Sequence, residues 1–253
     1  MPNLSRLRQS AKLARLVASR DLGAALDTSI APVVLIASVL LVNTAFMNGF
    51  FLDGRVEMSS FFRAMPLFLA VFLPALSMRL FAEERKTRTI EVLFALPITA
   101  GEAVLGKYLA GLGLFSLFLV GTLPIPLMLL VLGSPDLGAI FAGYVGVFFL
   151  GAELLALGVL ASAITTDQIV AFVAAAVPGS ALVLLGDFRV KRVLDGLTES
   201  QSLGSDVAAL VSPTPAFEVC VSGVVGLPSL VHFAAFTVFF LWAAAKQLDR
   251  TSA

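Results

Sequence analysis

A stretch with the spacing of a phosphate-binding loop, GEAVLGKY, occupies residues 101–108. In a true P-loop, G-x-x-x-x-G-K is followed by Ser or Thr, because that hydroxyl binds Mg²⁺ while backbone amides and the Lys bind phosphate. Here Tyr108 takes the hydroxyl position, and the carboxylate of Glu102 would repel a phosphate. Thr99 and Glu102 also have the spacing of a helix capping box, which predicts that Lys107 lies inside a helix. We therefore predict that this stretch does not bind nucleotide.

Few other side chains have a pattern that suggests chemistry. The single cysteine, Cys220, excludes an intrachain disulfide, and the single histidine, His232, leaves no Cys and His cluster with metal-ligand spacing. The sequence also has no Ser-His, paired-Asp or H-E-x-x-H arrangement, which disfavours an intramembrane enzyme. We expect no catalytic residue, no metal and no cofactor bound by this chain.

Glu153 is unusual because it lies near the middle of a long apolar run. Inserting an acid at the centre of a membrane costs about 3 kcal/mol, so such a residue should face protein and be protonated or hydrogen-bonded. No Lys or Arg lies at a comparable depth, and Asn43 and His232 are the polar candidates in other runs. We expect Glu153 either to tie helices together or to lie along a substrate path.

The elements that hold these residues belong to a membrane protein. Of the 253 residues, 58% are apolar and 13% are charged, whereas soluble domains have about 25% charged residues. The net charge of zero argues against a nucleic-acid surface.

The apolar residues form six runs, each with at most one ionisable residue. A spanning helix needs about 20 apolar residues, and the short second run is flanked by Arg63 and Arg79, whose side chains can reach the two interfaces. The sequence therefore predicts an all-α polytopic membrane protein with six transmembrane helices, formed by one domain over residues 1–253. The runs cover residues 28–52, 64–78, 108–135, 137–166, 168–186 and 219–245.

The distribution of basic residues predicts the orientation. With the N-terminus in the cytoplasm, twelve of the 17 Lys and Arg residues fall on the cytoplasmic side. Cytoplasmic loops are enriched in such residues, so we expect both termini to be cytoplasmic. The outer cluster of Arg189, Lys191 and Arg192 weakens this bias.

Residues 1–27 have the pattern of an amphipathic helix at the membrane surface. Leu4, Leu7, Ala11 and Ala14 recur at helical spacing with basic residues between them. The basic side chains suit the lipid phosphates of the inner leaflet. An organelle presequence is the alternative, because the first twenty residues are Arg-rich and contain no acid.

The most charged part of the protein is the loop that follows the second run. Its segment AEERKTRTIEVLFALP places Ile90, Leu93 and Phe94 along one side of a short helix that Pro97 ends. An apolar edge of this kind can fit a groove of a cytoplasmic partner. A solvated loop helix is the alternative.

Two blocks of the sequence resemble the ABC-2 type transporter permeases, in particular the branch of gliding-motility and nitrous-oxide-reductase maturation permeases. The blocks are MRLFAEERKTRTIEVLFALPITAGEAVLGKYLAG and GSPDLGAIFAGYVGVFFLGAELLALGVLASAITTDQIVAF. The second includes the Asp167-Gln168 step after the fourth span. Arg88 and Glu153 depart from the pattern, which usually has Gly and a small apolar residue there.

The resemblance implies a permease subunit of an exporter in the bacterial cytoplasmic (inner) membrane. ATP and Mg²⁺ would then bind a separate P-loop ATP-binding subunit, and a second permease copy, identical or paralogous, would complete the pathway. An auxiliary outer-face subunit is also compatible, and residues 187–227 would form short re-entrant helices at the outer face. Residues 83–96 would be the coupling helix that contacts the ATPase, through Glu83, Glu84, Arg85, Thr89, Ile90, Glu91, Leu93, Phe94 and Pro97.

Two other functions stay open at this stage. An ion-coupled secondary transporter would need no ATPase, but the sequence shows no pair of repeated halves with matching broken segments. A membrane anchor that transmits force without moving a substrate is the second alternative. The sequence does not identify a substrate.

Overall fold

The computed structural model of the chain describes residues 4–28, 30–53, 57–87, 99–196 and 203–251. These residues form α-helices joined by short connections, with no β-strand among them. The described helices are α1 (Leu4–Asp27), α2 (Ile30–Asp53), α3 (Ser59–Ser77), α4 (Ala82–Lys86), α6 (Ala100–Thr122), α7 (Pro124–Leu132), α8 (Leu137–Ile164), α9 (Gln168–Leu185), α10 (Phe188–Gly196), α11 (Leu203–Val211), α12 (Pro213–Val221) and α13 (Leu227–Thr251).

Among the described residues, six segments are long and apolar enough to cross a membrane, which confirms the predicted fold class. They are built on α2, on α3 with α4, on α6 with α7, and on α8, α9 and α13. The six predicted runs correspond to these segments in order.

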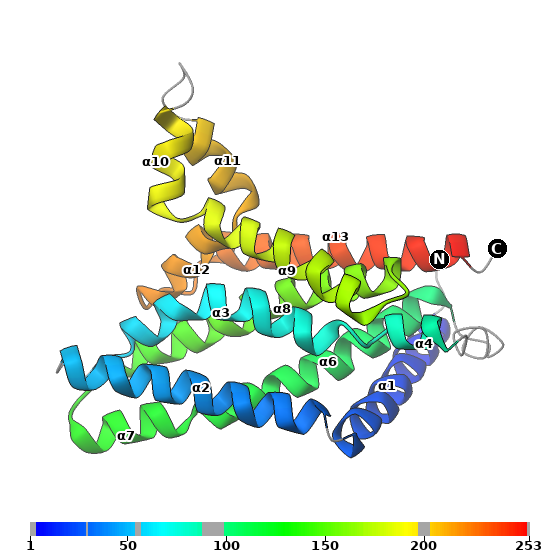
Figure 1. Cartoon of the computed structure of the whole chain (residues 1–253), viewed down its shortest axis with the longest axis horizontal. Coiled ribbons are helices and arrows are strands. Elements are labelled where there is room, and N and C mark those ends of the chain that lie inside the picture. The colour runs from blue at the N-terminus through cyan, green and yellow to red at the C-terminus, as the bar shows by residue number, and fades with distance from the viewer. Residues whose placement is uncertain (1–3, 29, 54–56, 88–98, 197–202, 252–253) are drawn as a thin grey trace.

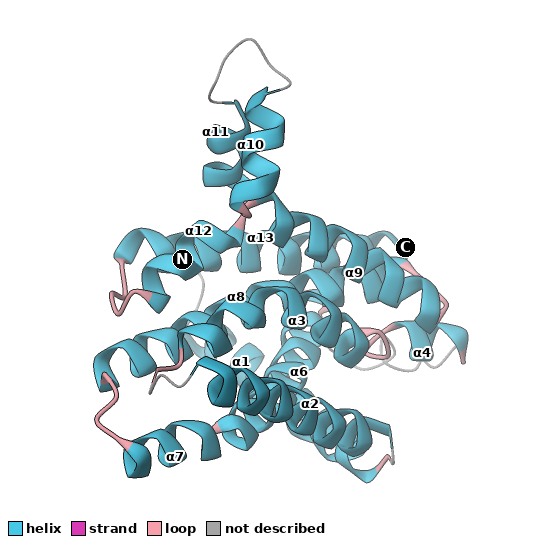
Figure 2. Ribbon diagram, turned by 60° about the vertical axis from the view of Figure 1, so that its left-hand side comes forward, coloured by secondary structure: helices cyan, strands magenta, loops and turns pink. Residues whose placement is uncertain are grey.

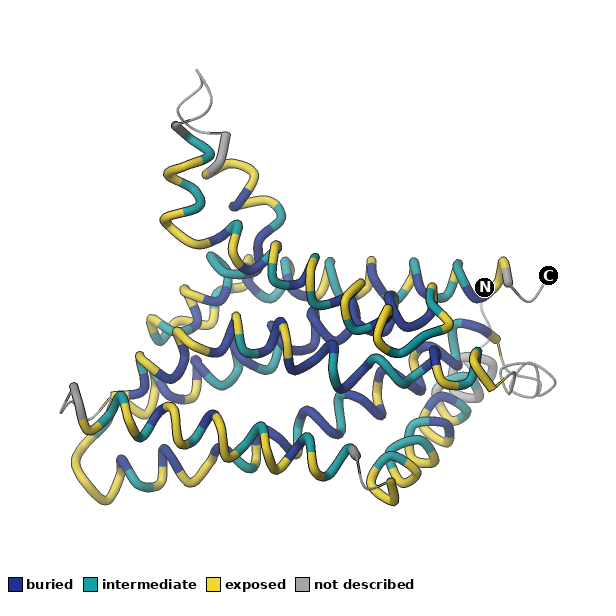
Figure 3. Tube along the Cα trace, in the orientation of Figure 1, coloured by how far each residue is buried: buried dark blue, intermediate teal, exposed yellow. Residues whose placement is uncertain are grey.

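Helix α8 is the centre of the bundle. It packs against α13, α3, α9, α12 and α6, and its buried residues continue along most of its length (Figure 3). Helices α2 and α9 lie at the periphery, where most of their surface is exposed. Because the outward side chains are apolar, exposure here means contact with lipid or with another membrane protein rather than with water.

Small residues allow the neighbours of α8 to approach it closely. A Cβ atom on Gly151 would overlap the ring of Phe115 in α6, and one on Gly158 would overlap Ser77 in α3. Glycine at these positions lets bulky partners fill the space that a side chain would occupy.

Two of the predicted spans are interrupted. The third breaks between Thr122 and Pro124, where α7 begins with its own proline. The sixth apolar run, 219–245, does not form one helix as we expected. Its first residues belong to α12, a turn at Gly223 with φ of 91° follows, and α13 starts only at Leu227. The run is continuous in hydropathy, but the left-handed backbone at Gly223 separates two helices.

The two ends of the bundle differ (Figures 1 and 2). We call the end with α1 and α4 the α4 end, and the end with α7 and α12 the α12 end. Helices α10 and α11 pack against each other and project away from the bundle as a hairpin. The basic residues of α10 therefore lie apart from those of α1 and α4.

Candidate functional site

The described part of the predicted coupling segment is α4, which follows α3 after one turn. Glu83, Glu84 and Arg85 lie in this five-residue helix. The other predicted contact residues lie outside the described residues: Thr89, Ile90, Glu91, Leu93, Phe94 and Pro97. The structure therefore places the beginning of the segment, and its contacts define the candidate site.

Ser162 of α8 fixes the start of α4. Its hydroxyl accepts hydrogen bonds from the backbone N–H groups of Phe81, at 2.9 Å, and Ala82, at 3.1 Å. It also donates to the carbonyl oxygen of Met78, at 3.2 Å. The first amides of a helix have no partner within it, so this buried hydroxyl satisfies two of them and ties the α3–α4 turn to the central helix.

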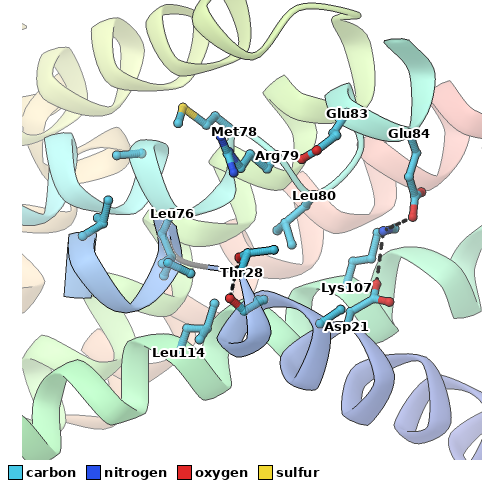
Figure 4. A pocket seen from close by; sticks show the side chains of 15 residues that line it. Asp21, Thr28, Leu76, Met78, Arg79, Leu80, Glu83, Glu84, Lys107 and Leu114 are labelled. Carbon is cyan, nitrogen blue, oxygen red and sulfur yellow. Dashed lines mark hydrogen bonds and ion pairs between the residues drawn. The ribbon is translucent and has the colours of Figure 1, made fainter. Parts of the chain in front are cut away.

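Lys107 of α6 holds α4 from the opposite side. Its ammonium group lies 2.8 Å from Oε1 of Glu84 and 3.1 Å from Oδ2 of Asp21 in α1. The Lys107 side chain is 4% exposed. Its Nζ atom lies 5.1 Å from the centre of the Phe81 ring, with which it forms a cation–π contact. A buried ammonium needs such partners, so the three charges join α1, α4 and α6 at one point (Figure 4).

A weaker contact joins α4 to the start of α9. Nζ of Lys86 lies 4.0 Å from a carboxylate oxygen of Asp167, and both side chains are largely exposed. Asp167 also caps α9 by accepting from the amides of Ile169 and Val170. Gln168, the other residue singled out after the fourth span, is the first residue of α9. Exposed ion pairs contribute at most about 1 kcal/mol, so helix capping is the larger role of Asp167.

The helix predicted to start near GEAVLGKY is present. Helix α6 begins at Ala100, with Thr99 and Glu102 forming both hydrogen bonds of the capping box. Lys107 is therefore inside a helix, as predicted. What the sequence did not indicate is its burial and its two carboxylate partners.

Helix α1 packs along α6 on the same side as the Lys107 ion group. Ala14 and Val17 are buried there, and Gly106 leaves the space that Val17 fills. The basic side chains of Lys12 and Arg15 are exposed on the outer side of α1. This arrangement agrees with the amphipathic pattern for the part of α1 whose burial is described.

The intramembrane polar residues do not form one cluster. Glu153 is fully buried in α8, and neither carboxylate oxygen has a hydrogen-bond partner among the described residues. Asn43 instead donates to the carbonyl oxygen of Gly121, at 3.2 Å, because α2 packs against α6. The ring of His232 packs against Phe233 and Phe236 of its own helix. Neither candidate is therefore hydrogen-bonded to Glu153.

Sequence reasoning missed three residues of the site: Lys107, Asp21 and Ser162. Lys107 had a usable signal, since it is a lone cation immediately before the third apolar run. Asp21 is the first acid in a basic segment, which also marks it as exceptional. Ser162 had no signal beyond its small size.

A comparison with protein families gives one match. Residues 38–246 match the family model described as ABC-2 family transporter protein. The match begins within α2 and ends within α13, so it includes α4, Ser162 and Lys107. A search of curated proteins found no match. With a family match over most of its length and six candidate spans, the chain belongs to the ABC-2 family of transporter proteins, as a membrane subunit rather than a catalytic one.

Proposed function

We propose that this chain is the permease subunit of an ATP-driven exporter and that residues 83–96 couple it to a separate ATP-binding subunit. Membership of the family implies an ATP-binding partner in general. The partner would carry ATP and Mg²⁺, and the α4 end would face the cytoplasm of a bacterial inner membrane. A second permease copy, identical or paralogous, would complete the pathway, and the resemblance of the two sequence blocks supports the gliding-motility and nitrous-oxide-reductase maturation branch.

One observation supports the coupling role above the others. The turn that leads into the segment is held by the Ser162 hydroxyl of α8, and Glu84 within the segment is held by the Lys107 ammonium of α6. A displacement of the loop by a partner would therefore pass into two spans instead of being absorbed by a flexible turn. Through Asp21, the same contact reaches α1.

The exposed position of α4 is also compatible with docking. Three residues at the beginning of the coupling segment are exposed at the α4 end: Glu83, Lys86 and Thr87. Phe94 follows later in the same segment of the sequence. An apolar residue on a charged surface segment is a typical anchor for a partner groove.

The first test is to purify the tagged chain from its native host under gentle extraction, then identify partners by mass spectrometry and measure ATPase activity. A stoichiometric P-loop subunit should be recovered with the wild type and lost with Phe94→Asp, because a carboxylate in an apolar groove cannot be paired. A milder change, Glu91→Ala, should keep the complex but reduce transport-coupled ATPase activity.

A matched control is Phe188→Asp, which adds the same charge at an exposed phenylalanine in the α10–α11 hairpin. This variant should still bind the ATPase. If Phe94→Asp retains the partner, or the two variants behave alike, the coupling role of the segment is wrong. Recovery of the wild-type chain without any ATPase would favour an ion-coupled secondary transporter or a membrane anchor.

A further inference from the structure

A cavity of about 250 Å³ lies between α1, α2, α3, α4 and α6 at the α4 end (Figure 4). Thr28 and Ala31 line it where α2 begins, and Arg79 and Glu83 line it where the second span ends. These positions are at the limits of membrane-spanning segments. The cavity therefore lies at the depth of lipid headgroups, where a polar rim and an apolar floor suit an amphiphile.

The cavity wall divides into polar and apolar parts. Figure 4 shows Asp21, Glu84 and Lys107 at one end of the cavity and Leu76 and Leu114 at the other. Alanine and valine side chains of α1 and α2 extend the apolar part. A hydrocarbon chain that leaves the bilayer could follow this surface, since burying apolar area there is favourable.

Arg79 and Glu83 give the cavity its recognition chemistry. Nε of Arg79 is buried without a hydrogen-bond partner among the described residues. Neither Arg79 nor Glu83 forms an ion pair with any other described residue. Both side chains line the same wall, next to the Lys107 group. One guanidinium and one carboxylate thus face a space that the chain itself does not fill.

The charges select among lipids. Asp21, Glu83 and Glu84 oppose Arg79 and Lys107, so the cavity has one net negative charge. A guanidinium binds a phosphate diester with two hydrogen bonds, and a carboxylate binds a primary ammonium. An anionic headgroup would satisfy only the arginine and would meet an excess of negative charge.

We propose that this cavity binds the headgroup of one phospholipid of the phosphatidylethanolamine type from the adjacent leaflet, with its phosphate on Arg79, its ammonium on Glu83 and one acyl chain on the apolar floor. The cavity is smaller than the range of about 300–1,000 Å³ for whole-ligand pockets, which suits a headgroup whose chains remain partly in the bilayer. The bound lipid would fill the space between α1 and the α3–α4 turn. The proposal does not depend on the presence of an ATPase.

The test uses the full chain, delipidated in detergent, with native mass spectrometry as the measurement. Phosphatidylethanolamine, phosphatidylglycerol and phosphatidylcholine of the same acyl composition are titrated separately. The wild type should bind phosphatidylethanolamine about tenfold more tightly than phosphatidylglycerol, since one charge-assisted hydrogen bond differs between them. Equal affinity for the two lipids, or no retained lipid at all, would overturn the proposal.

Two variants assign the two contacts. Glu83→Gln should remove the preference for the ethanolamine headgroup: phosphatidylethanolamine should bind more weakly, and phosphatidylglycerol at least as tightly as in the wild type, because one negative charge of the cavity is gone. Arg79→Gln should weaken all three lipids about tenfold, because every headgroup uses its phosphate. The control is Arg63→Gln, near the start of α3 at the α12 end of the bundle and outside this cavity, which should leave all affinities unchanged. If Arg79→Gln and Arg63→Gln behave alike, the arginine does not bind lipid here.

Discussion

Lys107 shows how a residue that resembles part of a catalytic motif can instead have a positional role. Its ammonium group is surrounded by Glu84, Asp21 and the ring of Phe81. Two carboxylates around one cation leave a net negative charge, so the ammonium of Lys107 is already neutralised and does not attract a nucleotide phosphate. The lysine therefore holds three helices together, and the nucleotide in the proposed complex belongs to the partner subunit.

Replacing this lysine tests the ion group directly. Lys107→Met should lower the free energy of unfolding by about 2–3 kcal/mol, because it leaves two carboxylates facing each other without a cation. This value is below that for fully buried pairs, since Asp21 and Glu84 retain 13% and 24% exposure. Thermal unfolding in detergent would measure the loss.

The control for this variant is Lys86→Met, whose exposed ion pair with Asp167 should contribute less than about 0.5 kcal/mol. Adding Asp21→Asn to Lys107→Met should recover part of the stability. Similar unfolding temperatures for Lys107→Met and Lys86→Met would contradict the structural role of the ion group.

Glu153 is the second residue whose role can be tested alone. Its side chain is fully buried without a hydrogen-bond partner in the described part of the chain, so its burial opposes folding. Glu153→Leu should raise the free energy of unfolding by about 1–2 kcal/mol, and Glu153→Gln should change it by less than about 1 kcal/mol. Unfolding in detergent gives the stability, and the ATPase assay of the purified complex gives the activity.

We expect both Glu153 variants to retain transport-coupled ATPase activity. A stabilised variant without activity would instead assign Glu153 to the substrate path. A loss of stability in both variants would mean that the carboxyl group binds a partner that the structure does not include.

At the scale of elements, α4 is short and depends on its neighbours. A helix of five residues has too few internal hydrogen bonds to be stable by itself. Its start is instead held by Ser162, and its glutamate by Lys107. The contact between α8 and the α3–α4 turn is therefore the physical link between the proposed coupling segment and the centre of the bundle.

Removing the Ser162 hydroxyl should loosen that link. Ser162→Ala leaves the amides of Phe81 and Ala82 buried without an acceptor and should cost about 1–3 kcal/mol. Hydrogen exchange of these two amides should become faster than that of other amides. A general loss of stability would instead affect amides throughout the bundle.

A matched control is Ser116→Ala, because the Ser116 hydroxyl donates only to Leu112 of its own helix. Its effect should stay below about 0.5 kcal/mol. If Ser162→Ala exchanges no faster at Phe81 and Ala82 than this control, α4 is held by other contacts.

At the scale of the whole molecule, the central helix α8 connects the two ends of the bundle, because it packs against α4 at one end and α12 at the other. Helix α8 runs through the bundle, with Ser162 at its α4 end and Gly146 packed against Cys220 of α12. Close-packed helices move as units rather than deforming. A displacement at α4 would therefore be felt by α12, which is what an ATP-driven export mechanism requires.

The exposed apolar surfaces of α2 and α9 belong to the same scale. Few of their residues are buried within one chain, so lipid or a second copy must cover them. Six spans are few for a complete transport pathway, and a second copy would provide twelve. The exposed faces of α2 and α9 are therefore the surfaces through which the proposed dimer could form.

Much of this architecture could be predicted from the sequence because it depends on local patterns. The six spans follow from runs of apolar residues, and the start of α6 follows from Thr99 and Glu102, three residues apart. The exceptional burial of Glu153 followed from its position within an apolar run. Each of these features is determined by residues close to one another in the chain.

The candidate site, in contrast, was decided by the tertiary structure. Lys107 is 86 residues from Asp21 and 23 from Glu84, and Ser162 is 80 residues from Ala82. No periodicity indicates which distant charges will meet, because that depends on how the helices pack. The same holds for the break at Gly223, where hydropathy is continuous and the backbone conformation is not. The sequence by itself thus determined the membrane spans and their number, whereas the tertiary structure decided where a span breaks and which side chains join the helices.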